Sequence, residues 1–151
     1  MIALSDAAIG FAPLLVGMGA SAFFTPRPYA QCGVKRGLNP PPYVFAVAWT
    51  TLYALQGAAA AVAWRADGRR WSRATAAAAL TFAALVAWSL VFFNVCLPRA
   101  AFAAIVMGLL PLSIAVAALY AAERRTASAA MSLPLVAWLC VAGYLSFMAI
   151  P

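Results

Sequence analysis

Long apolar segments alternate with short polar segments from one end of the chain to the other. Each of the five apolar segments is about 20 residues long, which is the length that an α-helix needs to cross the hydrocarbon core of a bilayer. The pattern predicts an all-α membrane protein, a single domain built as a five-transmembrane-helix bundle. The predicted helices cover residues 7–24, 43–64, 74–96, 100–121 and 130–150, and a loop over residues 25–41 joins the first two. Pro134 is expected in the first turn of the fifth helix.

The composition supports a membrane location. Hydrophobic residues make up 67% of the 151 residues and charged residues make up 9%, whereas soluble domains carry about 25% charged residues. The ten basic residues stand in short clusters between the apolar segments, which is typical of membrane-flanking loops and not of a nucleic-acid-binding surface. The expected partners therefore include the lipid bilayer and exclude nucleic acid.

The distribution of the basic residues predicts an orientation. The loops after the first and third helices hold four of them, and the loops after the second and fourth helices hold six, namely Arg65, Arg69, Arg70, Arg73, Arg124 and Arg125. The positive-inside rule places the richer side in the cytoplasm. We therefore expect a cytoplasmic amino terminus, in the inner membrane of a bacterium.

The sequence offers few groups for catalysis. It contains no histidine, and its three acidic residues, Asp6, Asp67 and Glu123, lie at helix ends or in loops. Proton-coupled transport normally uses ionisable groups inside the membrane, and the three cysteines lack the spacing of a disulfide framework or a zinc site. We therefore predict no catalytic residue, no metal site and no enzymatic activity. What remains is recognition by shape, apolar contact and aromatic stacking.

The segment from Asn39 to Tyr53 carries the strongest local signal. Consecutive prolines end the preceding loop, and Pro42 suits the first turn of a helix because the N–H that proline lacks has no partner there. Phe45, Trp49 and Tyr53 follow at a spacing of four, which places their rings on one helix face. A proline-stiffened entrance above a wall of aromatic rings suits a flat apolar ligand. A helix start with an interfacial aromatic anchor is the alternative.

Further residues within the predicted helices indicate how the helices meet. Gly10, Gly17, Gly19 and Ala20 are small enough for close helix approach. The amide of Gln56 needs either a partner on another helix or a ligand, because an unpaired amide is costly inside a membrane. Trp64 and Trp71 flank a basic loop and fit the headgroup level of the bilayer.

Three motifs resemble those of a known family. The first is Asn39-Pro40-Pro41-x-Tyr43-Val44-Phe45, followed by Trp49-Thr50-x-Leu52-Tyr53. The second is Trp88-Ser89-x-x-Phe92-Phe93, and the third is Pro134-x-x-x-Trp138. In this order and spacing they resemble the TspO/MBR family, which comprises tryptophan-rich sensory proteins and the mitochondrial translocator (peripheral benzodiazepine receptor) proteins. The resemblance extends over nearly the whole chain.

The resemblance implies a bundle of five helices, often dimeric, with a ligand pocket under the first long loop. The family is associated with porphyrins, haem, cholesterol and synthetic isoquinoline or benzodiazepine ligands, and its bacterial members with tetrapyrrole and carotenoid regulation. The implied function is that of an integral membrane binding or sensory protein. Its ligand would be flat and apolar, such as a tetrapyrrole (porphyrin or haem), a sterol or a carotenoid, and no cofactor is required.

Carried over residue by residue, the resemblance predicts a ligand-binding site and a lid. Trp49 and Trp138 would line the pocket, with Tyr53, Trp88 and Phe92 nearby. Helical spacing adds Phe45, on the face of Trp49, and Ala142, on the face of Trp138, to the predicted ligand-binding residues. The lid residues are Tyr29, Asn39, Pro40 and Pro41, in a loop whose composition fits a lid and a plain tether equally well.

The sequence departs from the family pattern at several polar and stacking positions. Gly37 and Leu38 stand where the family has a tryptophan pair, Leu85 stands where it has an asparagine, and Leu135 stands where it has a tyrosine. These departures keep a second interpretation open. The chain would then be an accessory structural subunit of a larger membrane assembly, such as a bacterial photosynthetic pigment–protein complex. A homodimer is the simpler assembly that the resemblance implies.

Overall fold

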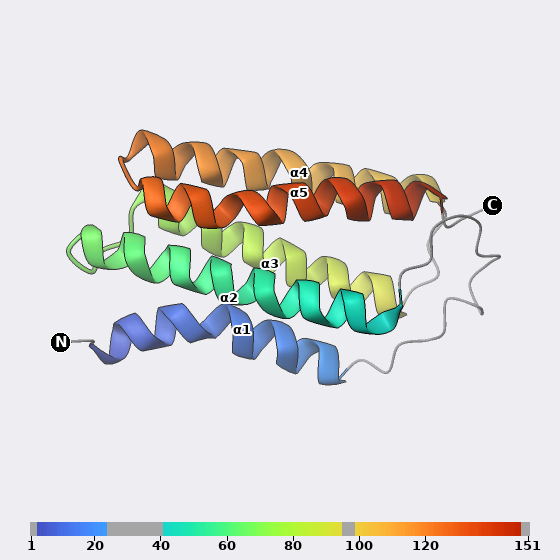
Figure 1. Cartoon of the computed structure of the whole chain (residues 1–151), viewed down its shortest axis with the longest axis horizontal. Helices are drawn as coiled ribbons and strands as arrows, with labels where there is room; N and C mark the ends of the chain where they lie inside the picture. Colours follow the sequence, from blue (N-terminus) through green and yellow to red (C-terminus); the bar gives the residue numbers. More distant parts are fainter. Residues whose placement is uncertain (1–2, 24–40, 95–98, 149–151) are drawn as a thin grey trace.

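A computed structural model of the chain describes residues 3–23, 41–94 and 99–148, with side chains at all of these positions except 21–23, 42, 89–94, 99–103 and 145–148. The described residues form five helices and no strand (Figure 1). The helices are α1 (Leu4–Phe23), α2 (Pro42–Ala66), α3 (Arg73–Asn94), α4 (Arg99–Ala122) and α5 (Thr126–Met148). The predicted all-α membrane bundle is thereby confirmed.

The helices lie side by side and form a ring in the order α1, α2, α5, α4, α3 (Figure 1). α1 packs closely on α2 and α4 packs closely on α5, while α2–α5 and α3–α4 contacts join the two pairs. α3 touches α1 and α2 only sparsely. The ring is therefore loosest along the line where α3 faces α1 and α2.

The amino-terminal helix begins three residues earlier than predicted, at Leu4 instead of residue 7. The carboxylate of Asp6 accepts a hydrogen bond of 3.1 Å from the backbone N–H of Ala3, which precedes the helix. An acidic residue in the first turn that reaches back in this way satisfies an otherwise unpaired N–H and stabilises the helix start. The charge of Asp6 thus extends the helix beyond the apolar segment.

The fifth helix begins at Thr126 instead of residue 130, so the prediction that Pro134 lies in its first turn is wrong. The hydroxyl of Ser128, which is fully buried, donates a hydrogen bond of 2.8 Å to the backbone carbonyl of Ala59 on α2. Small hydroxyl residues are typical of a loop in the sequence, but here they lie in the helix and form a helix–helix contact. The proline inside α5 is tolerated because neighbouring helices stabilise a membrane helix that loses one backbone hydrogen bond.

The start of α2 agrees with the sequence. Pro41 precedes the helix in an extended conformation (φ −57°, ψ 147°), and Pro42 is its first residue. Proline fits this position because its ring fixes φ near the helical value and the missing N–H has no intrahelical partner. The prediction for Pro42 is therefore confirmed.

Three of the described helical segments are long and apolar enough to cross a membrane: Tyr43–Ala66, Ala104–Ala122 and Thr126–Tyr144. The apolar segments Leu4–Ala20 and Arg73–Trp88, in α1 and α3, are shorter. Large apolar side chains are exposed on the outside of the bundle, as at Leu80, which is 74% exposed. Such a surface is suited to contact with lipid chains.

Helices α1 and α2 approach so closely that their contact requires glycine. A Cβ atom at Gly57 would overlap the backbone carbonyl oxygen of Gly10, and a Cβ atom at Gly17 would overlap the ring of Tyr53. Small residues at such crossings let two backbones meet, which is how membrane helices gain packing contacts without a hydrophobic driving force. The predicted close approach is confirmed at Gly10 and Gly17, whereas it is wrong for Gly19, where a Cβ atom would meet nothing within 4 Å.

Candidate functional site

Trp49 of α2 lies at the centre of a group of rings from three helices. Its ring centroid is 5.5 Å from that of Tyr53, 5.8 Å from Trp88 on α3 and 6.4 Å from Trp138 on α5. Phe45 adds an edge-on contact with Trp138, at 5.9 Å. We call these five residues the aromatic cluster. Five of the seven predicted ligand-binding residues are therefore brought together by the fold.

The rings of the aromatic cluster meet in tilted and edge-on arrangements. The planes of Trp49 and Trp88 are inclined by 40°, and those of Trp49 and Trp138 by 85°. These are the geometries that aromatic pairs favour, because the negative ring face then meets a positive ring edge. Trp88 and Tyr53 are buried, whereas Trp49, Trp138 and Phe45 are half-buried. Part of the surface of the cluster is thus exposed.

The indole N–H of Trp138 is a notable group in the cluster. Its Nε1 atom is buried, and no hydrogen-bond acceptor for it exists among the residues that the structure describes. A buried indole N–H usually has a partner, since leaving it unpaired is costly in apolar surroundings. This donor gives the cluster one polar group besides its apolar rings.

The other predicted site residues have different positions. Ala142 is buried in the same apolar core as Trp88. Pro41 is exposed immediately before α2. Tyr29, Asn39 and Pro40 lie outside the described residues, as does the side chain of Phe92.

Two positions at which the sequence departs from the family pattern are part of the core. Leu85 of α3 and Leu135 of α5 are almost completely buried in the cluster of side chains that contains Trp88. Both also line a small hollow in the middle of the bundle. At these two positions, apolar side chains pack in the core where the family pattern has polar side chains.

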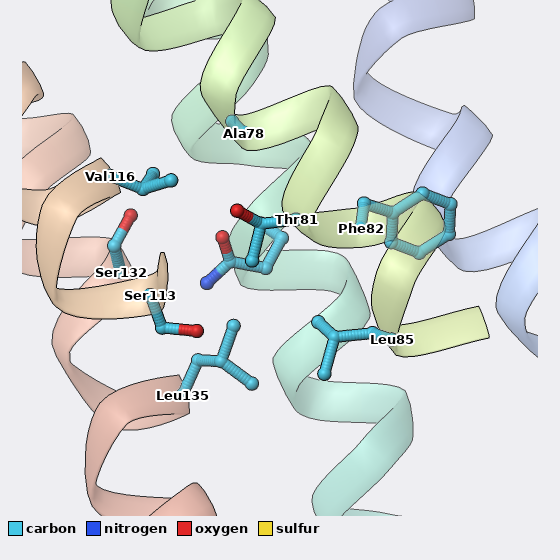
Figure 2. A pocket seen from close by; sticks show the side chains of 9 residues that line it. Ala78, Thr81, Phe82, Leu85, Ser113, Val116, Ser132 and Leu135 are labelled. Atoms are coloured by element: carbon cyan, nitrogen blue, oxygen red, sulfur yellow. The ribbon is translucent and has the colours of Figure 1, made fainter. Parts of the chain in front are cut away.

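The small hollow lies between α2, α3, α4 and α5 and has a volume of about 10 Å³. The hydroxyls of Thr81 on α3 and Ser113 on α4 point into it, and Ser132 of α5 borders it (Figure 2). Gln56 lines it as well, and the Nε2 atom of this amide is buried without a hydrogen-bond partner in the described ranges. The volume is that of a single water molecule, and its polar lining could hold one.

Replacing Gln56 with methionine, which has a similar shape and no amide, is expected to raise the free energy of unfolding by about 1 kcal/mol, because a buried unpaired donor is removed. The measurement is the midpoint of thermal unfolding in detergent micelles. Thr51→Val, at an exposed position of the same helix, controls for a general effect of added hydrophobicity. A lower midpoint for Gln56→Met would show that the amide makes a stabilising hydrogen bond.

The opposite end of the bundle carries most of the described charges, and we call it the basic end. The carboxylate of Asp6 is buried and binds both Arg69, at 3.0 Å, and Arg65, at 3.2 Å. Asp6 lies in the first turn of α1, before its charge-free residues 7–23, so this contact lies outside the part of α1 that is suited to cross the membrane. The hydrogen bonds from Arg69, and next from the Ala3 N–H, hold the pKa of Asp6 well below its usual range. The carboxylate therefore stays ionised at neutral pH and fastens α1 to the loop after α2.

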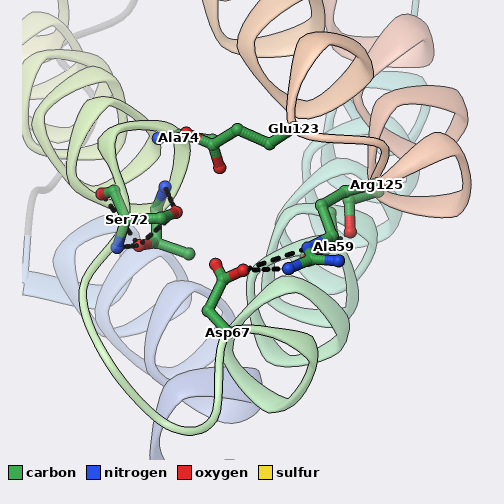
Figure 3. A network of polar contacts seen from close by, with 8 residues as sticks. Ala59, Asp67, Ser72, Ala74, Glu123 and Arg125 are labelled. Atoms are coloured by element: carbon green, nitrogen blue, oxygen red, sulfur yellow. Dashed lines mark hydrogen bonds and ion pairs between the residues drawn. The ribbon is translucent and has the colours of Figure 1, made fainter.

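Further polar contacts join the two loops at the basic end (Figure 3). Asp67 forms an ion pair with Arg125, which links the loop after α2 to the loop before α5. Ser72 and Thr75 exchange hydrogen bonds between backbone N–H groups and hydroxyls at the start of α3, as in a capping box. These contacts place the amino terminus and both loops at one end of the bundle, as a five-span topology requires.

The sequence profile of the TspO/MBR family matches residues 9–150 of the chain. The chain belongs to the TspO/MBR family. It is 30% identical to Tryptophan-rich protein TspO of Chlorobaculum tepidum over 142 residues, which cover 89% of this chain and 86% of that protein. It is 31% identical to Protein CrtK of Rhodobacter capsulatus over 145 residues, which cover 93% of this chain and 88% of that protein.

Membership of the TspO/MBR family confirms the resemblance found in the three sequence motifs. It also identifies the chain as a helical membrane protein, in agreement with its apolar helices and exposed apolar surface. The family is in general one of binding and sensory proteins, and neither relative bears the name of an enzyme.

Some residues of this TspO/MBR protein were not identified from the sequence. Thr81, Ser113 and Ser132 line the small hollow, and each stands between two apolar residues in the sequence. A threonine or serine can hydrogen-bond its own helix, as Ser113 does to the carbonyl of Leu109 at 3.0 Å. The pattern of isolated hydroxyls was therefore visible, but only the fold shows that three helices bring them to one place.

Proposed function

We propose that the protein binds a flat, largely apolar ligand of the tetrapyrrole type at the aromatic cluster. The observation that carries the proposal is the meeting of Trp49, Trp88 and Trp138 from three different helices. Indole rings offer large, rigid apolar faces at low cost in conformational entropy, which makes them suited to a planar ligand. Rings from one helix alone would form a single wall, whereas rings from three helices face a common place.

The chemistry of the cluster defines the ligand class. The half-buried rings of Trp49 and Phe45 offer apolar contact through their exposed parts. The unpaired N–H of Trp138 offers one hydrogen bond to a ligand acceptor, such as a carboxylate or carbonyl oxygen. A planar apolar body with an acceptor at its edge matches this arrangement, and a porphyrin with propionate groups is the example that we propose to test.

Protoporphyrin added to the purified full-length protein in detergent micelles is expected to quench tryptophan fluorescence in a saturable manner. Trp138→Phe keeps an aromatic ring but lacks the N–H, so it should weaken binding about 2- to 10-fold, which is the loss of one hydrogen bond. Trp71→Phe removes an exposed indole remote from the cluster and should leave the dissociation constant unchanged.

Two results would count against this function. Quenching that rises linearly with porphyrin would indicate partition into the micelle and no site. Equal dissociation constants for the wild type and Trp138→Phe would show that the unpaired indole has no role in binding. In the first case, the interpretation of the chain as a scaffold in a larger membrane assembly would be the better one.

We also propose that the protein lies in the bacterial inner membrane with the basic end in the cytoplasm. The contacts of Asp6 with Arg65 and Arg69 place the amino terminus at that end, and the positive-inside rule assigns it to the cytoplasm. In a variant without native cysteines, Ala127→Cys should react with an impermeant maleimide only after cells are opened. Pro41→Cys, at the other end of the bundle, should react in intact cells, and the reverse pattern would invert the topology.

A further inference from the structure

A second and larger hollow lies on the loose side of the ring, between α1, α2 and α3. Its volume is about 160 Å³, and we call it the seam hollow. Ile9 and Pro13 of α1, Ala60 and Trp64 of α2, and Ala79 and Phe82 of α3 are among the residues that line it. Its lining includes neither Trp49, Trp88 nor Trp138, so it is separate from the aromatic cluster.

The packing of the helices explains why the seam hollow exists. α3 packs chiefly on α4 and makes only sparse contact with α1 and α2. Its lining includes four alanines, Ala12, Ala60, Ala78 and Ala79, whose short side chains fill little space. By contrast, the close contacts at Gly17 and Gly57 bring α1 and α2 together. The volume is similar to the roughly 150 Å³ of an engineered apolar cavity that accepts a small apolar guest.

The seam hollow has an apolar interior and a polar mouth. It extends from Trp64, near the basic end, to Gln56, two helical turns deeper, a distance of about 12 Å along α2. Trp64 and Trp71 meet edge-on at its outer part, with ring centroids 5.5 Å apart. The Nε1 atom of Trp64 is buried and has no hydrogen-bond partner within the described part of the chain.

Four arginines stand in residues 65–73, the segment that contains Trp71 of the seam hollow. Arg70 and Arg73 are exposed and flank Trp71 in the sequence, and neither has an ion-pair partner among the residues described. Arg65 and Arg69 share the single carboxylate of Asp6. The mouth therefore carries an excess of positive charge next to an apolar channel at the expected level of the lipid headgroups.

We propose that the seam hollow is a binding site for one anionic phospholipid. One acyl chain lies between α1, α2 and α3, and the phosphate group lies against Arg70 and Arg73. The indole N–H of Trp64 donates a hydrogen bond to an ester carbonyl, which lies between the chain and the phosphate in such a lipid. Basic pockets between membrane helices on the cytoplasmic side bind anionic headgroups in this manner.

The test compares dioleoyl phosphatidylglycerol with dioleoyl phosphatidylcholine, which have the same acyl chains and different headgroup charge. Native mass spectrometry of the full-length protein released from micelles should show one phosphatidylglycerol, retained about fivefold more tightly than phosphatidylcholine. The double variant Arg70→Gln/Arg73→Gln should lose this preference and keep the weaker binding of phosphatidylcholine. Inorganic phosphate at high concentration should not displace the lipid, because it lacks the acyl chain.

A matched pair of substitutions on α3 tests the seam hollow itself. Ala79→Leu fills the hollow and should weaken retention of both lipids at least tenfold, whereas Ala83→Leu, one turn further on an exposed position outside its lining, should have no effect. The thermal unfolding midpoint of each variant verifies that it is folded. Equal retention by the two leucine variants, equal retention of the two lipids by the wild type, or displacement by free phosphate would each overturn the proposal. None of these measurements depends on a ligand at the aromatic cluster.

Discussion

Replacing Gly57 with alanine is expected to force α1 away from α2 and to lower the free energy of unfolding by about 3 kcal/mol. The added methyl group would overlap the backbone carbonyl oxygen of Gly10. A backbone atom in a packed helix cannot rotate aside as a side chain can, so the whole of α1 has to shift. That shift would also disturb the contact of Tyr53 with α1 at Gly17. The measurement is the thermal unfolding midpoint in micelles, together with the yield of folded protein.

Two glycine controls make this prediction specific. Gly10→Ala would bring the new Cβ to 3.5 Å from the Cβ of Ala61, which is ordinary van der Waals contact, so it should be tolerated far better. Gly108→Ala, on α4, meets nothing within 4 Å and should be neutral or slightly stabilising, since alanine favours a helix over glycine by about 1 kcal/mol. If Gly57→Ala were as stable as Gly108→Ala, the close crossing of α1 and α2 would be refuted.

Trp49→Ala is expected to weaken protoporphyrin binding by far more than tenfold and to destabilise the bundle. Trp49 is the one ring that contacts Tyr53, Trp88 and Trp138 together. Each aromatic pair contributes about 0.5–1.5 kcal/mol beyond the burial of apolar area, so removing the indole removes three such contacts at once. The fluorescence titration gives the dissociation constant, and the unfolding midpoint gives the loss of stability.

A second variant separates binding from folding at this position. Trp49→Phe keeps a ring that can meet Trp88 and Trp138 and should fold close to normally, while its smaller face weakens binding to a lesser degree than alanine. A binding constant that remains unchanged in Trp49→Phe and in a folded Trp49→Ala protein would remove the aromatic cluster from consideration as the ligand site. Trp71→Phe again reports whether the quenching depends on tryptophans elsewhere.

Much of the site could be predicted because helical periodicity fixes which residues share a face. The spacing of Phe45, Trp49 and Tyr53 placed three rings in a row on α2, and the motif on the third helix supplied Trp88. The family resemblance then supplied Trp138 on α5, which the fold brings to Trp49. Periodicity could not indicate that these rings pack against one another between the helices, since ring packing depends on the distances between the helices.

The sequence by itself determined that this protein is a five-helix membrane bundle of the TspO/MBR family with aromatic residues on three of its helices. These properties follow from segment length, apolar composition and local spacing, which are features of the chain and not of its packing. Only the tertiary structure decided that α5 begins at Thr126, that Leu85 and Leu135 are core residues, and that α3 stands off from α1 and α2. The physical reason is that glycine contacts draw α1 onto α2 while α3 packs chiefly on α4. Such differences in helix separation arise from pairs of distant residues that no local pattern reveals.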